Sequence, residues 1–191
     1  LLAPSSEGQL RAMRSAYERA GWDPRDVDLI ECHATGTPVG DAVEFQSLRT
    51  LWGPEGWSPG QCTIGSVKSN IGHALTAAGA AGLLKVLFAI GDRTLPPTAN
   101  FTTPGPKLDY EGGPFRVLTE SRDWPPRDPG RPRRAAISGF GFGGINAHAL
   151  IEEWLPGSSD VGGAGGGHHD GAGRGGVAVP VATASISAHF G

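Results

Sequence analysis

The residues best suited to chemistry stand at a predicted bend near the middle of the chain. The stretch Gly65–Gly82, GSVKSNIGHALTAAGAAG, contains a cation at Lys68 and an imidazole at His73. On one continuous helix these two side chains would point about 140° apart, because each residue turns the chain by about 100°. The turn-forming run Asn70–Gly72 instead predicts that Lys68 lies in a loop and that a helix begins near His73. Both side chains can then face one pocket.

Chemistry at such a bend would act on a developing negative charge. An imidazole in the first turn of a helix feels the positive end of the helix dipole, which favours its neutral form and leaves a ring N–H free to donate. His73 would therefore suit an oxyanion or enolate. The spacing alone leaves open the alternative that Lys68 is solvated and His73 only caps a helix.

A second candidate histidine follows a predicted strand. The apolar run Val27–Cys32 (VDLIEC) delivers His33 at its carboxyl end, where ligands bind in open α/β sheets. In the loop ATGTPVGD that follows, backbone N–H groups and the hydroxyls of Thr35 and Thr37 can approach a ligand. Cys62–Val67 is the matching strand before the Lys68 bend. The chain thus repeats one pattern, a strand, a reactive loop and a helix.

Helices are predicted around these strands. A capping-box pattern at Ser6–Gln9 begins an amphipathic helix that ends at Gly21, and Asp41–Glu44 caps a second helix that ends at Gly53–Pro54. The run Ala74–Ile90 is small at first and bulky later, which indicates a buried central helix. Its interruption by a lysine, and its length, exclude a membrane span.

The last third of the domain is predicted as loops and strands. Thr94–Pro106 should be extended and irregular, Phe115–Leu118 an edge strand, and Arg122–Pro132 a proline-rich surface loop. Ala135–Phe140 and Asn146–Glu152 are predicted as two strands joined through GFGGI.

The glycine-rich stretch at 139–144, GFGFGG, resembles a dinucleotide-binding fingerprint. It lacks the following helix and the acidic residue about 20 positions on in an ordered βαβ unit that such a site needs. We interpret it as a glycine hinge at Gly141 and Gly143 that carries the aromatic residues Phe140 and Phe142. Such a loop can line or gate an apolar channel.

Composition narrows the class of protein. A chain of 191 residues can form one domain with a substantial core, and a formal net charge of −3 gives no case for nucleic-acid binding. The one basic run, RPRR at 131–134, predicts a solvated turn or a docking surface for an acidic partner. Cys32 and Cys62 form neither a metal-spacing pair nor a disulfide framework, so we expect a reducing, cytoplasmic setting and no metal. No export signal is visible, and the opening LLAPSSEG looks like the middle of a protein.

The chain divides into three parts. We expect a domain over residues 1–155, a glycine-rich flexible linker over 156–176, and over 177–191 the start of a following linker region or a disordered tail. The run VAVPVATASIS near the end could begin a strand of whatever follows.

Three motifs in this order, HATGT at 33–37, KSNIGH at 68–73 and GFGFGG at 139–144, resemble the C-terminal half of a β-ketoacyl synthase. The chain looks more narrowly like the ketosynthase domain of a type I polyketide synthase or of a polyunsaturated fatty-acid synthase. The resemblance implies an α/β architecture, the C-terminal half of a thiolase-like fold with a mixed sheet and a buried central helix; composition adds a disordered Gly-rich tail after it. It implies a homodimer when complete and an acyltransferase that condenses an acyl thioester with a malonyl-type extender.

The resemblance also implies roles for individual residues. His33 and His73 would stabilise the thioester enolate and assist decarboxylation, and Lys68 would order and charge the site. Thr35 and Thr37 would contact the phosphopantetheine arm of an acyl carrier protein, and the loop from Phe140 to Gly143 would gate the pocket. No cofactor is implied for the domain itself, because substrates arrive on that arm. Partners would be the carrier protein and the N-terminal half of the ketosynthase, with no nucleic acid and no membrane.

Two departures from the family pattern matter. Ala34 stands where many relatives have glycine, and alanine would be strained if the position needs a positive φ. The family's nucleophilic cysteine lies in a Ser-rich motif of the N-terminal half, and neither Cys32 nor Cys62 has that context. Cys32 stands beside His33, but adjacent strand residues point to opposite faces, so we expect Cys32 to face the core and the chain alone to be inactive.

Two other functions are compatible with parts of the pattern. A non-catalytic remnant or scaffold, similar to the chain-length-determining partners of ketosynthases, would keep the fold without condensing. Retention of both histidines and the lysine favours the catalytic lineage. A metal hydrolase that uses His33, His73 and His148 is disfavoured, because no acidic second ligand lies at helical spacing from either His33 or His73.

Overall fold

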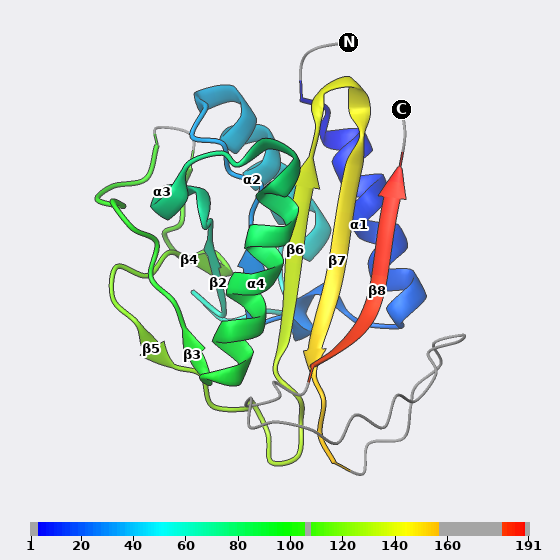
Figure 1. The fold of residues 1–191 in the computed structure, drawn as a ribbon, viewed down its shortest axis with the longest axis vertical. Coiled ribbons are helices and arrows are strands. Elements are labelled where there is room, and N and C mark those ends of the chain that lie inside the picture. Colours follow the sequence, from blue (N-terminus) through cyan, green and yellow to red (C-terminus); the bar gives the residue numbers. More distant parts are fainter. Residues whose placement is uncertain (1–3, 106–107, 157–180, 190–191) are drawn as a thin grey trace.

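The protein is built around a mixed β-sheet with helices on both faces (Figure 1). The computed structural model describes residues 4–105, 108–156 and 181–189. Within these residues, six strands follow the order β4-β2-β1-β6-β7-β8. Strands β4, β2, β1 and β6 run parallel, and β7 pairs antiparallel with both β6 and β8. Their bounds are β1 Leu29–Glu31, β2 Cys62–Gly65, β4 Phe115–Arg116, β6 Arg134–Phe140, β7 Asn146–Glu153 and β8 Val181–His189. A separate antiparallel pair joins β3 (Thr94–Leu95) to β5 (Arg122–Asp123).

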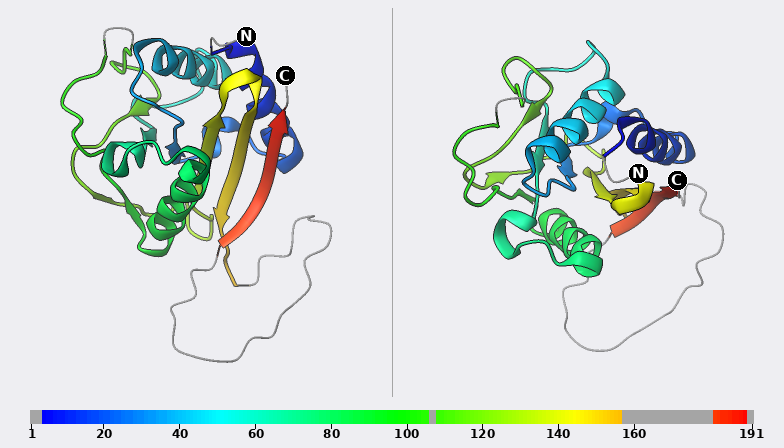
Figure 2. Two further views of the ribbon diagram at one scale, coloured as in Figure 1. Left: turned by 45° about the horizontal axis from the view of Figure 1, so that its top comes forward. Right: turned by 90° about the horizontal axis from the view of Figure 1, so that it is seen from above.

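The helices form a layer on each face of the sheet. Figure 2 shows α1 (Ser6–Ala20) and α2 (Pro38–Trp52) on one face and α4 (Ala78–Gly91) on the other. Short 3₁₀ turns lie at Pro24–Asp26, Leu75–Ala77 and Phe142–Gly144. No helix of the described ranges is both long and apolar enough to cross a membrane.

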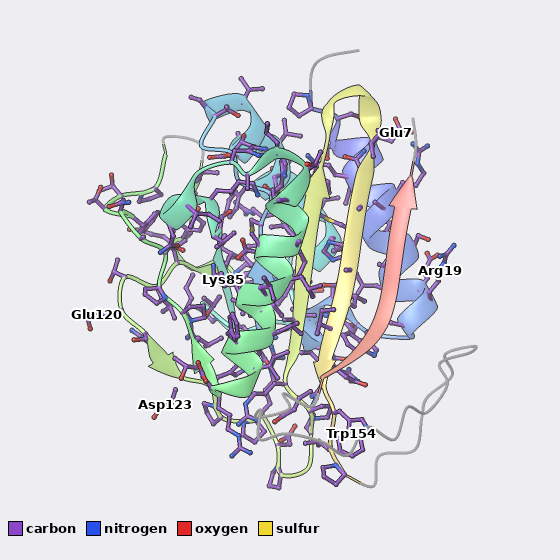
Figure 3. All side chains as sticks on the ribbon, in the orientation of Figure 1. Glu7, Arg19, Lys85, Glu120, Asp123 and Trp154 are labelled. Carbon is purple, nitrogen blue, oxygen red and sulfur yellow. The ribbon has the colours of Figure 1, made fainter. Side chains whose placement is uncertain are left out.

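Each face of the sheet has its own hydrophobic core. Because successive strand residues point to opposite faces, neighbouring residues of β1 enter different cores. Ile30 packs with Met13 of α1 and Leu48 of α2, whereas Leu29 packs with Val86 of α4. The outer side of α1 is charged, and Figure 3 shows Glu7 and Arg19 there.

Helix α1 has the predicted extent, but its N-terminus is not capped as predicted. Gly21 ends α1 in the left-handed conformation, with φ 66°. The capping box is wrong, because the N-cap makes no side-chain hydrogen bond. Ser6 Oγ and Gln9 Oε1 instead each lie 2.8 Å from Ser47 Oγ on α2. Both polar side chains are used to join the two helices.

The second helix begins four residues earlier than predicted, because its cap is Thr37 and not Asp41. Pro38 occupies its first turn, and Thr37 Oγ1 caps it by accepting the N–H of Gly40 at 3.2 Å. The predicted caps turn back to the preceding loop instead. Asp41 accepts the N–H of Gly36 at 3.2 Å, and Glu44 bonds further upstream.

The bend after β2 differs from its prediction. Lys68 does not lie in a loop but begins the four-residue helix α3 (Lys68–Ile71). Gly72, with φ 75°, then reverses the chain, and the long helix α4 begins only at Ala78. His73 therefore lies before α4, not in its first turn, and the expected effect of the α4 dipole on His73 is withdrawn.

Helix α4 packs on the sheet through one side only. Val86, Ala89 and Ile90 are buried against the strands. On the opposite side Leu84 and Phe88 are 52% and 61% exposed. The central helix predicted as buried thus presents an apolar surface in this chain.

The arginines of the basic run at 131–134 are paired within the fold, which corrects the prediction of a solvated turn, whereas the docking surface stays a prediction. Arg131 pairs with Asp26. Arg133 is buried and bonds Glu153 through Nη1 at 2.7 and 2.8 Å. Arg134 bonds Glu152 at 3.0 Å and also covers an indole ring. These guanidinium groups tie the start of β6 to its neighbours.

The end of the chain contributes a strand to this sheet. The predicted flexible linker falls almost wholly on residues 157–180, which lie outside the described part of the chain. Beyond them Val181–His189 pairs antiparallel with β7, from Glu153↔Val181 to Asn146↔His189. A strand was expected near here as part of a following region, whereas it extends this sheet. The domain boundaries at 155 and 176 stay predictions.

Candidate active site

His33 and His73 come together at the carboxyl ends of two neighbouring strands. β1 and β2 pair in parallel, with Ile30 opposite Ile64, so the chain leaves both at the same edge. The two imidazole rings lie edge to face, with centroids 5.7 Å apart and an interplanar angle of 82°. The ring of Phe140 lies 5.9 Å from that of His33. Residues from three separate segments therefore converge.

The backbone at His33 is held by a buried carboxylate. Glu44 of α2 accepts the N–H of His33 and the N–H of Ala34, each at 2.7 Å. Ala34 has a φ of 27°, so the position does require a positive φ, as the departure from glycine suggested. These bonds hold a conformation that costs an alanine energy.

Glu44 was not among the predicted site residues. Burial raises its pKa to about 7, although the two N–H donors oppose that shift. Glu44 stands near the start of a predicted helix, so the sequence pattern indicates part of a cap. Its position one helical turn after Asp41 and close to the loop after His33 is the signal that could have identified it.

His73 has an identifiable tautomer when neutral. Its Nδ1 accepts the N–H of Leu75 at 3.0 Å, so the proton lies on Nε2. That N–H is free to donate toward a ligand. The contact with the Leu75 N–H, and not the α4 dipole, therefore leaves the expected ring N–H on Nε2.

His33 is held in its neutral form. Burial, followed by the positive charge of Lys68 and by His73, lowers its pKa from 6.5 to about 4. At neutral pH the imidazole of His33 is therefore uncharged and can donate or accept a hydrogen bond beside Lys68. Such an arrangement is suited to stabilising an anion that forms during a reaction.

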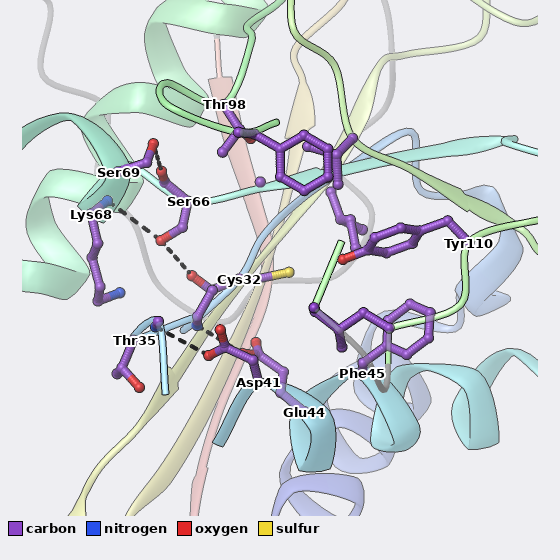
Figure 4. A pocket seen from close by; sticks show the side chains of 18 of the residues that line it. Cys32, Thr35, Asp41, Glu44, Phe45, Ser66, Lys68, Ser69, Thr98 and Tyr110 are labelled. Carbon is purple, nitrogen blue, oxygen red and sulfur yellow. Dashed lines mark hydrogen bonds between the residues drawn. The ribbon is translucent and has the colours of Figure 1, made fainter. Parts of the chain in front are cut away.

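A cavity of about 550 Å³ lies beside this pair. Figure 4 shows its polar side, with Thr35, Glu44 and Lys68, and its apolar side, with Phe45 and Tyr110. The histidine rings are not part of its wall. It joins the site through Lys68 and the backbone that carries His33.

The threonines take different positions. Thr35 lines the cavity, and its Oγ1 lies 3.2 Å from Thr37 Oγ1. Thr37 caps α2 and does not line the cavity. Of the two, Thr35 is therefore the one placed to meet a ligand in that space.

Cys32 is buried in the wall of the cavity without activation. Burial raises its pKa well above 9, and its thiol lies 3.8 Å from the carbonyl oxygen of Ile30. The thiolate needed for nucleophilic attack is disfavoured. Cys62 is fully buried in the same core, and its pKa is likewise raised.

The predicted gating loop connects β6 to β7. Phe140 ends β6 and faces His33, and Gly141 donates its N–H to the carbonyl of Ile145 at 2.7 Å. Gly143 has a φ of 80° and lets the loop reverse. The side chain of Phe142 lies outside the described part of the structure.

Histidine 148 does not join the site. It is buried between Ser138, whose Oγ lies 3.1 Å from its Nδ1, and the ring of Tyr17 at 5.5 Å. Among the described residues, no group of three His, Cys, Asp or Glu side chains could hold a metal ion. The geometry therefore offers no support for a metal hydrolase.

Comparison with known proteins identifies the family of the chain. Residues 1–102 match the family model described as "Beta-ketoacyl synthase, C-terminal domain". Over 156 residues the chain is 45% identical to the polyketide synthase PksL of Bacillus subtilis, an alignment that covers 82% of this chain and 3% of PksL.

Solved structures give the same result. The ketosynthase from module 6 of the bacillaene synthase of Bacillus subtilis superposes with a TM-score of 0.77 at 45% identity, over 81% of this chain and 28% of that one. A ketosynthase–chain length factor protein, PfaC, gives a TM-score of 0.67 at 41% identity, over 79% and 16%. The chain spans less than a third of each of these relatives.

Proposed function

Since this chain belongs to the β-ketoacyl synthase family, we propose that it forms the C-terminal part of a ketosynthase. The reaction would be the decarboxylative Claisen condensation of an acyl thioester with a malonyl-type extender. The observation that carries the proposal is the edge-to-face pair of His33 and His73 beside Lys68. A neutral imidazole at His33 beside the positive charge of Lys68 suits a reaction that forms an enolate.

Decarboxylation is the step assigned to the histidines. The bond between the carboxylate and the α-carbon of the extender breaks, carbon dioxide leaves, and the electron pair moves to the thioester oxygen. The Nε2–H of His73, directed by its Nδ1 contact with Leu75, would donate to that oxygen, and His33 would share the charge. A donor so placed is worth roughly 10²-fold or more in rate. Lys68 would raise the positive potential of the site.

Carbon–carbon bond formation needs a group that this chain does not supply. The α-carbon of the enolate attacks the carbonyl of an acyl group held as a cysteine thioester, and the cysteine thiolate leaves. Cys32 and Cys62 are buried with raised pKa values, so neither serves. The nucleophile would come from the N-terminal half.

The exposed apolar face of α4 supports an interface with the N-terminal half. Leu84 and Phe88 on α4, with Ile71 and Leu75 before it, expose more than half of their surfaces. Three of them, Ile71, Leu84 and Phe88, line one groove, and an exposed apolar patch of this kind marks an interface. We assign it to the N-terminal half, and we assign the cavity side of Thr35 to the phosphopantetheine arm of an acyl carrier protein. The complete enzyme would be a homodimer.

Substitution of the histidines in a ketosynthase that contains this chain tests the proposal. His33→Ala and His73→Ala should abolish release of carbon dioxide from a malonyl thioester while acyl loading continues. His148→Gln is the control and should retain both steps, because His148 lies outside the site. Equal loss of loading in the two alanine variants would contradict the assigned roles. Unchanged decarboxylation would favour a non-catalytic scaffold.

A further inference from the structure

Glu31 is a buried charge that the proposed mechanism does not use. It ends β1 two residues before His33, and only 2% of it is exposed. A carboxylate at such a place is tolerated only when hydrogen bonds and an opposite charge replace the water it has lost. The hydrogen-bond partners of its two carboxylate oxygens therefore show which parts of the chain Glu31 holds in place.

Each oxygen has a different partner. Oε1 accepts the backbone N–H of Val67 at 2.6 Å, and Oε2 accepts from Lys85 Nζ at 2.7 Å. Val67 directly precedes Lys68, and Lys85 lies on α4 (Figure 3). One carboxylate thus joins the end of β1, the start of the bend and the helix that follows it.

The packing leaves this carboxylate little freedom. Gly82 of α4 lies against it, and a Cβ at that position would come 3.0 Å from Glu31 Cγ. The side chain is confined between the helix and the bend. A second cross-link lies nearby, since Ser66 Oγ donates to the carbonyl of Cys32 at 3.2 Å.

The loop at His33 and the bend that begins at Val67 are consequently held by two different carboxylates. Glu44 fixes the backbone at His33 from the α2 side of the sheet. From the α4 side, Glu31 fixes the backbone at Val67, from which Lys68 and His73 follow. The distance between the two histidine rings depends on both attachments.

From these contacts we infer that Glu31 is a positioning residue, which with Lys85 sets the bend of Lys68 and His73 relative to His33. The inference rests on the proposed function for its kinetic consequence only. Loss of the carboxylate would release Val67, displace His73 and slow decarboxylation. Acyl loading, which depends on the nucleophile of the other half, would continue.

The kinetic test uses variants that leave no unpaired buried charge. Glu31→Ala combined with Lys85→Met should lower kcat for malonyl decarboxylation by about 10²-fold, the typical effect of a misplacement of about 1 Å. KM and the rate of acyl loading should stay unchanged. Glu31→Gln combined with Lys85→Met, which keeps an oxygen for the Val67 N–H, should recover most of the rate.

A second buried ion pair provides the matched control. Arg133 and Glu153 are also buried and bonded at 2.7 Å, at the opposite end of the strands. Glu153→Ala combined with Arg133→Met should leave the ratio of decarboxylation to loading unchanged. If this pair of substitutions lowers the ratio as much as the Glu31 pair does, Glu31 has only a structural role and the inference is wrong.

Hydrogen–deuterium exchange tests the inference without any activity. In the chain itself, the Glu31 and Lys85 substitutions should accelerate amide exchange in the segment 67–73, and the Glu153 and Arg133 substitutions should not. Unchanged exchange in that segment would overturn the inference. If His73→Ala retains decarboxylation while exchange responds as expected, the proposed function fails and the positioning of the bend stands.

Discussion

At the scale of single residues, the site depends on an alanine in an unfavourable conformation. Ala34 turns the chain away from His33 with a φ of 27°, and the N–H of each residue is tied to Glu44. The left-handed region costs a residue with a Cβ roughly 1–2 kcal/mol. Part of the free energy of the two hydrogen bonds to Glu44 therefore offsets the strain at Ala34.

Replacing Ala34 by glycine should stabilise the protein. The relief of strain should exceed the extra entropy that glycine gives the unfolded chain, for a net gain of about 0.5–1 kcal/mol in the free energy of unfolding. Denaturant unfolding measures this change. Ala80→Gly on an exposed position of α4 is the control and should cost about 1 kcal/mol. Destabilisation by both substitutions would contradict the strain at Ala34.

His33 should titrate far below an ordinary histidine. Because burial and Lys68 lower its pKa to about 4, its NMR titration midpoint should lie near that value and rise in Lys68→Gln. Arg49→Gln, a charge on the exposed side of α2, should leave it unchanged. A midpoint near 6.5 in the unaltered protein would contradict this description of the site.

The same shift links stability to pH. Between pH 6.5 and 4 the unfolded chain binds a proton at His33 that the folded chain does not bind. This contribution to the free energy of unfolding is complete above pH 6.5 and decreases as the pH falls toward 4. Its direction follows from a folded-state pKa that lies below the unfolded one.

The residues proposed to carry the chemistry could be predicted from the sequence, whereas the residues that hold them in place could not. His33, Lys68 and His73 stand in short motifs whose residue types already indicate a function. Glu31 and Glu44 act on backbone groups 36 and 11 positions away. Which N–H such a carboxylate accepts is decided by packing between elements, which no local pattern records.

At the scale of elements, the helix starts show where local signals succeed and fail. Thr37 is a true cap of α2, whereas Ser5 at the start of α1 makes no side-chain bond. Helix α4 has no side-chain cap either, since Ala77 precedes it. The turn residues Asn70–Gly72 predict a start near His73, but no capping residue marks the actual start at Ala78.

The caps should differ in their contribution to stability. Thr37→Ala removes the bond to the Gly40 N–H and should cost about 1 kcal/mol in the free energy of unfolding. Ser5→Ala is the matched control, and it should cost nearly nothing because no bond is lost. Thermal or denaturant unfolding of both variants decides the matter, and equal costs would contradict the assignment of Thr37 as the cap.

At the scale of the whole molecule, the described part of the fold leaves one apolar surface uncovered, on the outer side of α4. The sheet is covered on both faces, so its class was predictable from the alternation of strands and helices. The pairing of β8 with β7 was not, because a strand separated from its neighbour by a glycine-rich segment has no local signal of its partner. The outer side of α4 remains open in this chain.

That surface should bind the N-terminal half of a ketosynthase. Leu84→Lys and Phe88→Glu should weaken the association at least 10-fold, since each places a charge in an apolar interface. Their effect on the stability of the isolated chain should be small, because both side chains are exposed. Val39→Lys, at an exposed apolar position on α2, is the control for added charge, and isothermal titration calorimetry measures all three. Equal weakening by Val39→Lys would contradict this assignment.

The most direct test of the central claim is reconstitution of the site from two parts. This chain would be mixed with a separately produced N-terminal ketosynthase half that carries the cysteine, and release of carbon dioxide from a malonyl thioester would be measured. We expect release only when both parts are present, and none when the chain carries His73→Ala. Release by the N-terminal half alone at the same rate, or a stable complex that releases nothing, would contradict the claim that this chain supplies the decarboxylating histidines.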